Sequence, residues 1–373
     1  MSNEDNRFGD EPDSMGDISA GLLGLFRKNG VSQETLRKAI ESDSLHVLAV
    51  DLLLGPPGEL LSVAQVAEIS GIDKGVLVRL WRALGFTDPV DQQPSFHEID
   101  VEASTAFSGL LGSNPADVEV AIQLARVIGS ALARVAEAEI LSSIGLREIN
   151  RPERRLSNLE VAERFSNYVS QTVPTVPKLL SYVWLRHLHG ASKRLLMLRQ
   201  QGEGVELAQF ELTVGFLDLV GFTVLSQQLE TEELASLVNH FDEVSHDTVT
   251  GLGGRVVKMI GDEVMFVSED PEAAVEIAMT LQEIYSQDRE ISEVRAGLAH
   301  GMVLAKDGDY YGPVVNLASR IVNIATPGSI LVSDEVNKKI AEKVSIDSKA
   351  LQPRFLKDLG YVQLFRLKRS PSG

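Results

Sequence analysis

The sequence predicts two domains of different fold class, an all-α domain followed by an α+β domain. Apolar residues recur at three- and four-residue steps from Ile18 to about Leu198, which is typical of amphipathic helices. Beyond residue 206, short apolar runs typical of strands alternate with helical patterns. The length of 373 residues also exceeds the ~100–200 residues of an ordinary domain.

The first domain is expected to be helical over residues 18–177, behind a polar and acidic tail, residues 1–17, that we expect to be disordered. Segments 32–40 and 118–128 carry apolar residues at helical spacing, and Ser32 is placed to cap the first of them. These features predict a domain built from helices alone.

Residues 178–206 are expected to form a linker that couples the two domains. Pro174 and Pro177 interrupt the helical pattern before this segment, because proline disfavours the helix interior. Apolar residues then return as far as Arg199, as in an interrupted helix, before the glycine-containing stretch 200–204.

The second domain, residues 207–373, is expected to mix strands and helices. The expected strands cover residues 212–220, 255–267 (two strands that turn at Gly261 and Asp262), 294–300, 329–333 and 362–367, and the expected helices cover residues 231–250, 271–286 and 314–324.

Composition limits the partners and the cellular location. The formal charge of -18 argues against broad binding to nucleic acids or anionic membranes, because both depend on cationic surface. No apolar run approaches the ~18–20 residues that span a bilayer, and no secretory signal opens the chain, so we expect a soluble, cytoplasmic protein. The absence of cysteine leaves carboxylates and histidines as metal ligands, which favours hard ions such as Mg²⁺ or Mn²⁺.

Residues 61–86 have the proportions of a helix-turn-helix, with Gly71 at the turn, and resemble the opening of winged-helix regulators. A recognition helix needs cations that face the DNA groove, and only three are available here: Lys74, Arg79 and Arg82. The acidic stretch 88–102 follows. A structural pair of helices is therefore favoured over a DNA-binding motif.

Two aspartates are candidates for metal binding. Asp218 ends an apolar strand, with Gly221 and Thr223 just beyond it, and Thr223 is placed to cap a following helix. Asp262 lies at the tip of the expected hairpin and meets Asp218 if that hairpin pairs with the strand. Two such carboxylates can share two divalent ions. Taken singly, each has an ordinary alternative, a helix cap for Asp218 and a turn residue for Asp262.

Four further polar residues lie in the second domain. Lys258 stands on the same strand face as Asp262 but ~13 Å away, so the two are expected to contact different groups. Asp309 lies in a turn-rich segment. Asn316 and Arg320 are four residues apart, which places them on one face of a helix. Each of the four, taken alone, fits an ordinary surface or turn position.

Four patterns carry a resemblance to a known family. They read Phe-x-Asp-Leu-x-Gly-Phe-Thr from Phe216, Lys-x-x-Gly-Asp-Glu from Lys258, Asp-Tyr-Tyr-Gly from Asp309 and Val-Asn-x-Ala-Ser-Arg from Val315. In this order and at these separations they resemble the catalytic domain of class III adenylyl cyclases, over roughly residues 207–370. The resemblance implies a ferredoxin-like α+β fold and the conversion of ATP to 3′,5′-cyclic AMP and pyrophosphate.

The resemblance also implies roles for individual residues. Asp218 and Asp262, with the backbone of Leu219, would hold two divalent metal ions, Mg²⁺ or Mn²⁺. Asn316 would orient the ribose during in-line attack of its 3′ oxygen on the α-phosphorus. Arg320 would stabilise the charge that develops on the α-phosphate.

Lys258 and Asp309 resemble the pair that selects the base. Adenine offers an acceptor at N1 and a donor at its 6-amino group, which match a lysine and a carboxylate, whereas guanine offers the reverse. ATP is therefore the expected substrate, and a guanylyl cyclase is the nearest alternative.

Further substrate contacts are expected from three residues. Phe222 and Thr223 open the helix after Asp218, where backbone N–H groups can face phosphate oxygens. The Lys-Gly pair that is frequent in the family's late hairpin is absent, since the stretch reads Arg-Phe-Leu-Lys-Asp-Leu-Gly-Tyr from Arg354. Lys357 is our expected phosphate contact there, and Arg354 is its rival.

Sites of this family form between two catalytic domains, and this chain has one, so the resemblance implies a homodimer with two equivalent sites. A helical domain before a single cyclase domain resembles the autoinhibited, acid-responsive cyclases of actinobacteria. His187 and His189 lie in the expected coupling helix and could serve as a pH switch or simply as surface residues. Two alternatives come from other classes of protein. One is a helix-turn-helix regulator with a non-catalytic cyclase-like domain, and the other is a nucleotide sensor.

Overall fold

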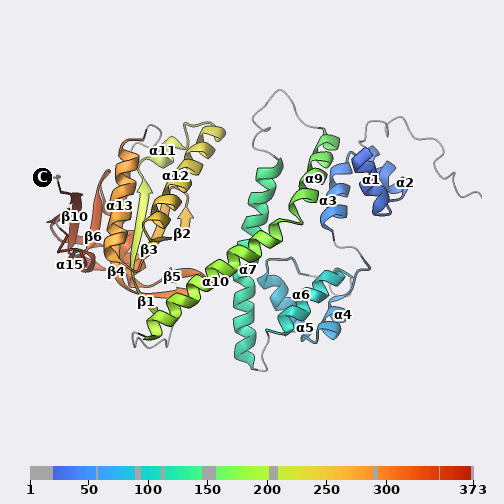
Figure 1. Cartoon of the computed structure of the whole chain (residues 1–373), viewed down its shortest axis with the longest axis horizontal. Helices are drawn as coiled ribbons and strands as arrows, with labels where there is room; N and C mark the ends of the chain where they lie inside the picture. The colour runs from blue at the N-terminus through green and yellow to red at the C-terminus, as the bar shows by residue number, and fades with distance from the viewer. Residues whose placement is uncertain are drawn as a thin grey trace, which may run out of the picture. The chain divides into compact units, whose positions relative to one another are not determined.

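The structure is a computed structural model that describes residues 20–55, 58–88, 94–110, 114–144, 157–200, 209–288, 293–343 and 345–370. The chain divides into two compact units, Met1–Leu196 and Met197–Gly373 (Figure 1). The tail expected at residues 1–17 and the end of the expected linker, residues 201–206, lie outside the described residues.

The described part of the first unit is built from helices joined by loops, with one isolated β-bridge between Leu61 and Phe96, which confirms the expected fold class. Its helices are α1 (Ala20–Lys28), α2 (Gln33–Glu41), α3 (Leu45–Leu54), α4 (Val63–Ser70), α5 (Lys74–Ala83), α6 (Glu98–Ser108), α7 (Pro115–Ile144), α9 (Asn158–Thr172) and α10 (Val176–Gln200). Helices α1, α2, α3 and α9 share one core around Phe26 and Ala49, and α4, α5, α6 and α7 share another around Val66 and Ile122. Ser32 caps α2 by accepting a hydrogen bond from the Thr35 N–H at 3.0 Å, as expected.

The helix pair at residues 61–86 is present as α4 and α5. Gly71 ends α4 in the left-handed conformation, and Asp73 caps α5. Two of the three cations considered for DNA contact are engaged by carboxylates, Arg79 by Glu119 and Arg82 by Asp88. These ion pairs reduce the cationic surface that this helix pair presents.

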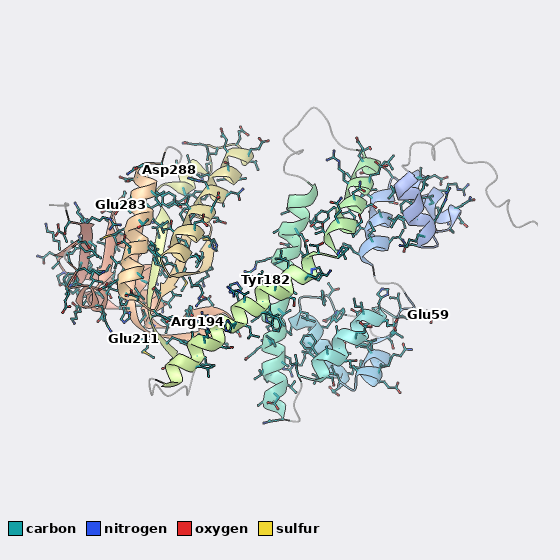
Figure 2. All side chains as sticks on the ribbon, in the orientation of Figure 1. Glu59, Tyr182, Arg194, Glu211, Glu283 and Asp288 are labelled. Atoms are coloured by element: carbon teal, nitrogen blue, oxygen red, sulfur yellow. The ribbon has the colours of Figure 1, made fainter. Side chains whose placement is uncertain are left out.

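Helix α10 runs without interruption, where the sequence predicted an interrupted helix. Pro177 lies in its first turn, where a missing N–H removes no helical hydrogen bond. Several large apolar side chains on α10 are exposed, among them Tyr182 and Trp184, each 61% exposed (Figure 2 labels Tyr182). None of the helices in the described part of the chain combines the length and apolarity that crossing a membrane requires.

The second unit is an α+β domain, as expected. Its strands are β1 (Gln209–Leu219), β2 (Arg255–Ile260), β3 (Glu263–Ser268), β4 (Val294–Lys306), β5 (Asp309–Tyr311), β6 (Ile330–Ser333), β7 (Ile346–Ala350), β8 (Arg354–Leu356), β9 (Gly360–Val362) and β10 (Leu364–Arg369), and its helices are α11 (Phe222–Leu225), α12 (Thr231–Gly251), α13 (Pro271–Ser286), α14 (Pro313–Ile324) and α15 (Asp334–Lys339).

The main sheet has the order β2-β3-β1-β4-β6-β10-β7, and β5 pairs with β4 at its edge. Strand β1 pairs antiparallel with both β3 and β4, whereas β4 and β6 are parallel. Helices α12, α13 and α15 cover one face of the sheet, called here the α13 face (Figure 1). Helix α14 covers the other, called the α14 face.

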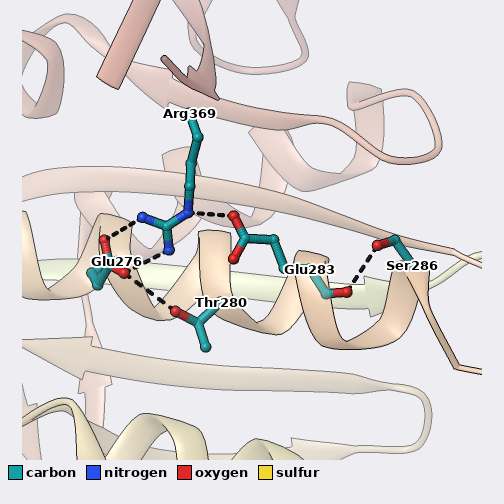
Figure 3. A network of polar contacts seen from close by, with 5 residues as sticks. All are labelled: Glu276, Thr280, Glu283, Ser286 and Arg369. Carbon is teal, nitrogen blue, oxygen red and sulfur yellow. Dashed lines mark hydrogen bonds and ion pairs between the residues drawn. The ribbon is translucent and has the colours of Figure 1, made fainter. Parts of the chain in front are cut away.

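A polar network connects β10, the last strand of the chain in the described residues, to α13. The Arg369 guanidinium donates hydrogen bonds to the carboxylates of Glu276 and Glu283, and Thr280 donates a further hydrogen bond to Glu276 (Figure 3). The side chains of Arg369 and Glu276 are 37% and 41% exposed. This network therefore joins two elements that are distant in sequence at the surface of the unit.

Candidate active site

Alternation along β1 directs Asp218 to the α14 face of the sheet. Its neighbours Leu217 and Leu219 pack on the α13 face, whereas Phe216 packs on the α14 face. Since successive side chains of a strand point to opposite faces, Asp218 shares a face with Phe216.

Gly297 of β4, which pairs with Phe216, lets α14 approach the sheet closely. A Cβ at this position would lie 2.3 Å from the Val322 nitrogen.

Asp218 lies between an acid and a base on the neighbouring strands. The ladders place Glu263 of β3 opposite it on one side and Arg295 of β4 on the other. The Arg295 Nε donates a hydrogen bond to Asp218 Oδ2 at 2.7 Å, and Nη2 lies 2.5 Å from the same oxygen. Burial nevertheless raises the pKa of the Asp218 carboxyl above its usual range, with Asp262 adding to the rise.

Asp262 is at the tip of the β2–β3 hairpin, as expected, and the hairpin pairs with β1. Its carbonyl accepts a hydrogen bond from the Leu219 N–H at 3.0 Å, which ties the hairpin tip to the end of β1. Burial, followed by repulsion from Asp218 and Asp262, raises the pKa of Glu263 to about 7. The structure therefore brings the two predicted aspartates together and adds a third carboxyl.

This carboxylate cluster fits part of a divalent metal site. Both contacts of Arg295 with Asp218 are to Oδ2, so within the described residues Arg295 does not occupy Oδ1. Oxygen donors that repel one another are the kind of ligands that Mg²⁺ and Mn²⁺ prefer. Over the described ranges, no group of three or more histidine, aspartate or glutamate side chains is placed to hold a metal ion. Substrate phosphates are the natural source of the missing oxygens.

Lys258 and Asp309 contact each other. The Lys258 Nζ forms an ion pair with the Asp309 carboxylate, and these side chains are 40% and 24% exposed. The other Asp309 oxygen accepts a hydrogen bond from the Tyr310 N–H at 2.7 Å. The expected base-selecting pair is thus assembled within one chain.

Asn316 and Arg320 are both exposed on α14, whose buried side contains Ala318, Ile321 and Val322. Arg320 lies 3.7 Å from the carboxylate of Asp358, in the turn of the β8–β9 hairpin. Lys357 precedes Asp358 in that turn and is exposed. The rival residue Arg354 is exposed at the start of β8.

Helix α11 differs from the expectation. It covers Phe222–Leu225 only, and Gly221 occupies the N-cap position in the left-handed conformation. Thr223 therefore lies inside the helix and does not cap it, so that prediction is wrong. Phe222 is half-buried and packs on the α13 face, whereas Thr223 is exposed.

Glu263 and Arg295 were not among the residues singled out from the sequence. Arg295 carries a visible signal, since it is the one cation in the apolar run from Val294 to Ala299. Glu263 directly follows Asp262 within a quoted pattern. What the sequence lacked was the strand register that sets both beside Asp218.

A partly buried carboxylate cluster, a lysine–aspartate pair and exposed polar groups on α14 together form a candidate site for a metal-dependent enzyme that binds a nucleotide. Comparison with known proteins identifies the family. The chain matches the "Adenylate and Guanylate cyclase catalytic domain" over residues 207–368 and the "Adenylate cyclase regulatory domain" over residues 19–191.

Among relatives, the chain is 39% identical to an adenylate cyclase of Streptomyces coelicolor, over 72% of this chain and 68% of that protein. It is 30% identical to a pH-sensitive adenylate cyclase of Mycobacterium tuberculosis, over 99% of this chain and 92% of that protein. A solved adenylyl cyclase from P. aeruginosa is 28% identical and covers 44% of this chain and 96% of its own, with a TM-score of 0.39.

The chain belongs to the adenylate and guanylate cyclase family, which confirms the membership predicted from the four sequence patterns. Catalytic domains of this family use divalent metal ions and bind a nucleotide substrate. The helical unit corresponds to a regulatory domain of the same family.

Proposed function

We propose that the protein converts ATP to 3′,5′-cyclic AMP and pyrophosphate. The observation that carries this choice of substrate is the contact between Lys258 and Asp309 at the surface of β2 and β5. One offers a donor and the other an acceptor, which match N1 and the 6-amino group of adenine. GTP would place a donor against the lysine and an acceptor against the carboxylate. The relatives from Streptomyces and Mycobacterium, both named adenylate cyclases, support the same substrate.

In the proposed reaction the ribose 3′ oxygen attacks the α-phosphorus and gives up its proton to water. The bond from the α-phosphorus to the oxygen that bridges it to the β-phosphate breaks, and pyrophosphate leaves. Asp218 and Asp262, with the backbone of Leu219, would hold two ions, Mg²⁺ or Mn²⁺. When bound, these ions lower the pKa of the 3′ hydroxyl and neutralise charge on the phosphates.

The other residues act on the nucleotide directly. Asn316 orients the ribose, and the fixed guanidinium of Arg320 stabilises charge on the α-phosphate in the transition state. Lys357, Phe222 and Thr223 are proposed as further contacts with the substrate. Of these, Lys357 is supported by its place next to Asp358, which pairs with Arg320.

We propose that two copies of the chain build each site. Within the described part of one chain, the contacts of Asp218 and Asp262 do not include Lys258, Asp309, Asn316 or Arg320. In a two-fold dimer of catalytic domains, the aspartates of one copy face the base-selecting and transition-state residues of its partner, which gives two equivalent sites.

The decisive test is cyclic nucleotide formation by the full chain and by a 207–373 fragment, each supplied with ATP or GTP and Mn²⁺. We expect cyclic AMP from ATP and little cyclic GMP. Absence of cyclic AMP with both proteins would refute the proposal, and Asp262→Asn is the matched inactive control.

We further propose that the helical domain, residues 18–177, inhibits the catalytic domain, residues 207–373, through the coupling segment 178–206. Equal specific activities of the full chain and the fragment would refute autoinhibition. The cytoplasm is the proposed location, as expected from the sequence. We expect no nucleic acid partner.

The pH-sensitive relative from Mycobacterium tuberculosis motivates a test of pH control. His187 and His189 are both exposed on α10. Replacement of both by Asn is expected to flatten the pH–activity profile of the full chain. An unchanged profile would contradict this role for the two histidines.

A further inference from the structure

The irregularity of β2 places two cations on one face of the sheet. The pairing of β2 with β3 shifts between Val256 and Lys258. Val256 and Met259 pack on the α13 face, whereas Val257 packs on the α14 face. Strict alternation would send Lys258 to the α13 face, so the shift turns it to the α14 face. Arg255 precedes Val256 and therefore lies on the α14 face as well.

Both cations contact consecutive residues of β5. Lys258 pairs with Asp309, while the Arg255 guanidinium donates a hydrogen bond to the Tyr310 hydroxyl. The guanidinium carbon of Arg255 also lies 5.1 Å from the centre of the Tyr310 ring. Tyr310 in turn packs on the core of the α14 face.

These contacts matter because β5 is a short strand. It is three residues long, pairs with the end of β4, and follows a turn in which Asp307 and Gly308 both have positive φ. Asp309 is the first residue of β5, and Tyr310 donates its N–H to the Asp309 carboxylate. A displacement of Tyr310 would therefore move the carboxylate that faces Lys258.

We infer that Arg255 and Tyr310 form a clasp that positions Asp309 and so sets the preference of the site for adenine over guanine. This inference rests on the proposed role of Lys258 and Asp309 in base selection. Neither Arg255 nor Tyr310 needs to touch the nucleotide. Both act through Asp309, which makes them positioning residues.

Two conservative variants test the clasp. Tyr310→Phe keeps the ring and removes the hydroxyl that Arg255 binds. Arg255→Lys keeps the positive charge and loses the planar fork. The matched control is Tyr311→Phe, at the next residue of β5, where the side chain is 48% exposed.

The measurement is the affinity of the full chain for 3′-deoxy-ATP and 3′-deoxy-GTP in the presence of Mn²⁺. These analogues lack the attacking hydroxyl, so their binding does not depend on turnover. We expect the wild type and Tyr311→Phe to prefer the adenine analogue, and Tyr310→Phe and Arg255→Lys to lose about five- to tenfold of that preference, the size of one lost hydrogen bond. With ATP itself, the loss should fall mainly on KM, because the contact with the base is present in both ground and transition states.

The inference is overturned if the wild type binds the two analogues equally well. It is also overturned if either clasp variant keeps the adenine preference of the wild type within about twofold, or if Tyr311→Phe lowers that preference as much as the clasp variants do. Preference for the adenine analogue without formation of cyclic AMP from ATP would instead refute the proposed function and leave the clasp intact. The two failures are thus distinguishable.

Discussion

Replacement of Arg295 by Met should destabilise the catalytic unit unless a divalent ion takes its place. The variant removes the hydrogen-bonded counterion of Asp218, whose side chain is 12% exposed, while Arg295 itself is 30% exposed. Loss of a hydrogen bond to a charged group costs roughly 1.5–3 kcal/mol, and an unpaired charge that is fully buried costs about 3–5 kcal/mol. Because Arg295 is partly exposed, we expect the free energy of unfolding to fall by about 2 kcal/mol. For a unit of this size, that corresponds to a melting temperature lower by about 4–8 °C.

The assay is thermal unfolding of the full chain. It is monitored by calorimetry, once in EDTA and once in Mn²⁺. We expect the melting temperature of Arg295→Met to lie below that of the wild type in EDTA. The difference should shrink with Mn²⁺, because the bound ion would neutralise Asp218 and its neighbouring carboxylates. Arg320→Met is the matched control, since its pair with Asp358 is long and exposed, and it should change the melting temperature by less than about 1 °C. A deficit below about 1 °C in EDTA, or one of equal size in both buffers, would refute the reasoning.

Two further predictions concern stability. Arg369 lowers the pKa of Glu276 by its hydrogen bond, so Glu276 contributes stability above its unfolded pKa of ~4.5 and loses that contribution as the pH falls through its lower folded value. Glu276→Gln should therefore cost up to ~1 kcal/mol at pH 7, given the exposure of the pair, and this cost should shrink as the pH falls below ~4.5; a difference that does not depend on pH in urea titrations would contradict this origin. Gly297→Ala should cost about 2–3 kcal/mol or more, because its Cβ meets the backbone of α14 and not a movable side chain. Gly251→Ala, with nothing within 4 Å of its Cβ, is the control and should stay within ~0.5 kcal/mol of wild type; equal losses in the two variants would contradict the close approach of α14.

Segments with a clear apolar pattern were predictable from the sequence, and short polar ones were not. Helix α13 has the predicted bounds, Pro271–Ser286, because Asp270 caps it and one whole side of it is apolar. The β2–β3 hairpin turns where predicted, at Gly261 and Asp262. Strands β5 and β7 and helix α15 were not predicted, because they contain few aliphatic residues. The equally short β6 was predicted, because it is an apolar run.

The candidate site was predictable as a set of residues and only partly as a geometry. The proximity of Asp218 and Asp262 followed from the expected pairing of the hairpin with β1. Arg295 could not be assigned to Asp218, because its place depends on the register between β1 and β4. Thr223 was misplaced because the left-handed Gly221 starts α11 earlier than the threonine suggested. The functional roles of the site residues stay predictions.

The two adjacent valines of β2 make Arg255 a determinant of how the protein folds. Suppose that Lys258 kept its pairing with β3 and that β2 had no irregularity. Val256 would then move to the α14 face and Val257 to the α13 face, with almost no change in buried apolar surface. This regular alignment would also turn Arg255 towards the core beneath α12 and α13, where a guanidinium without a partner is costly. The hydrophobic pattern fits both arrangements, and the charge of Arg255 favours the observed one. Replacement of Arg255 by an apolar residue would therefore permit a second, competing alignment of this edge strand.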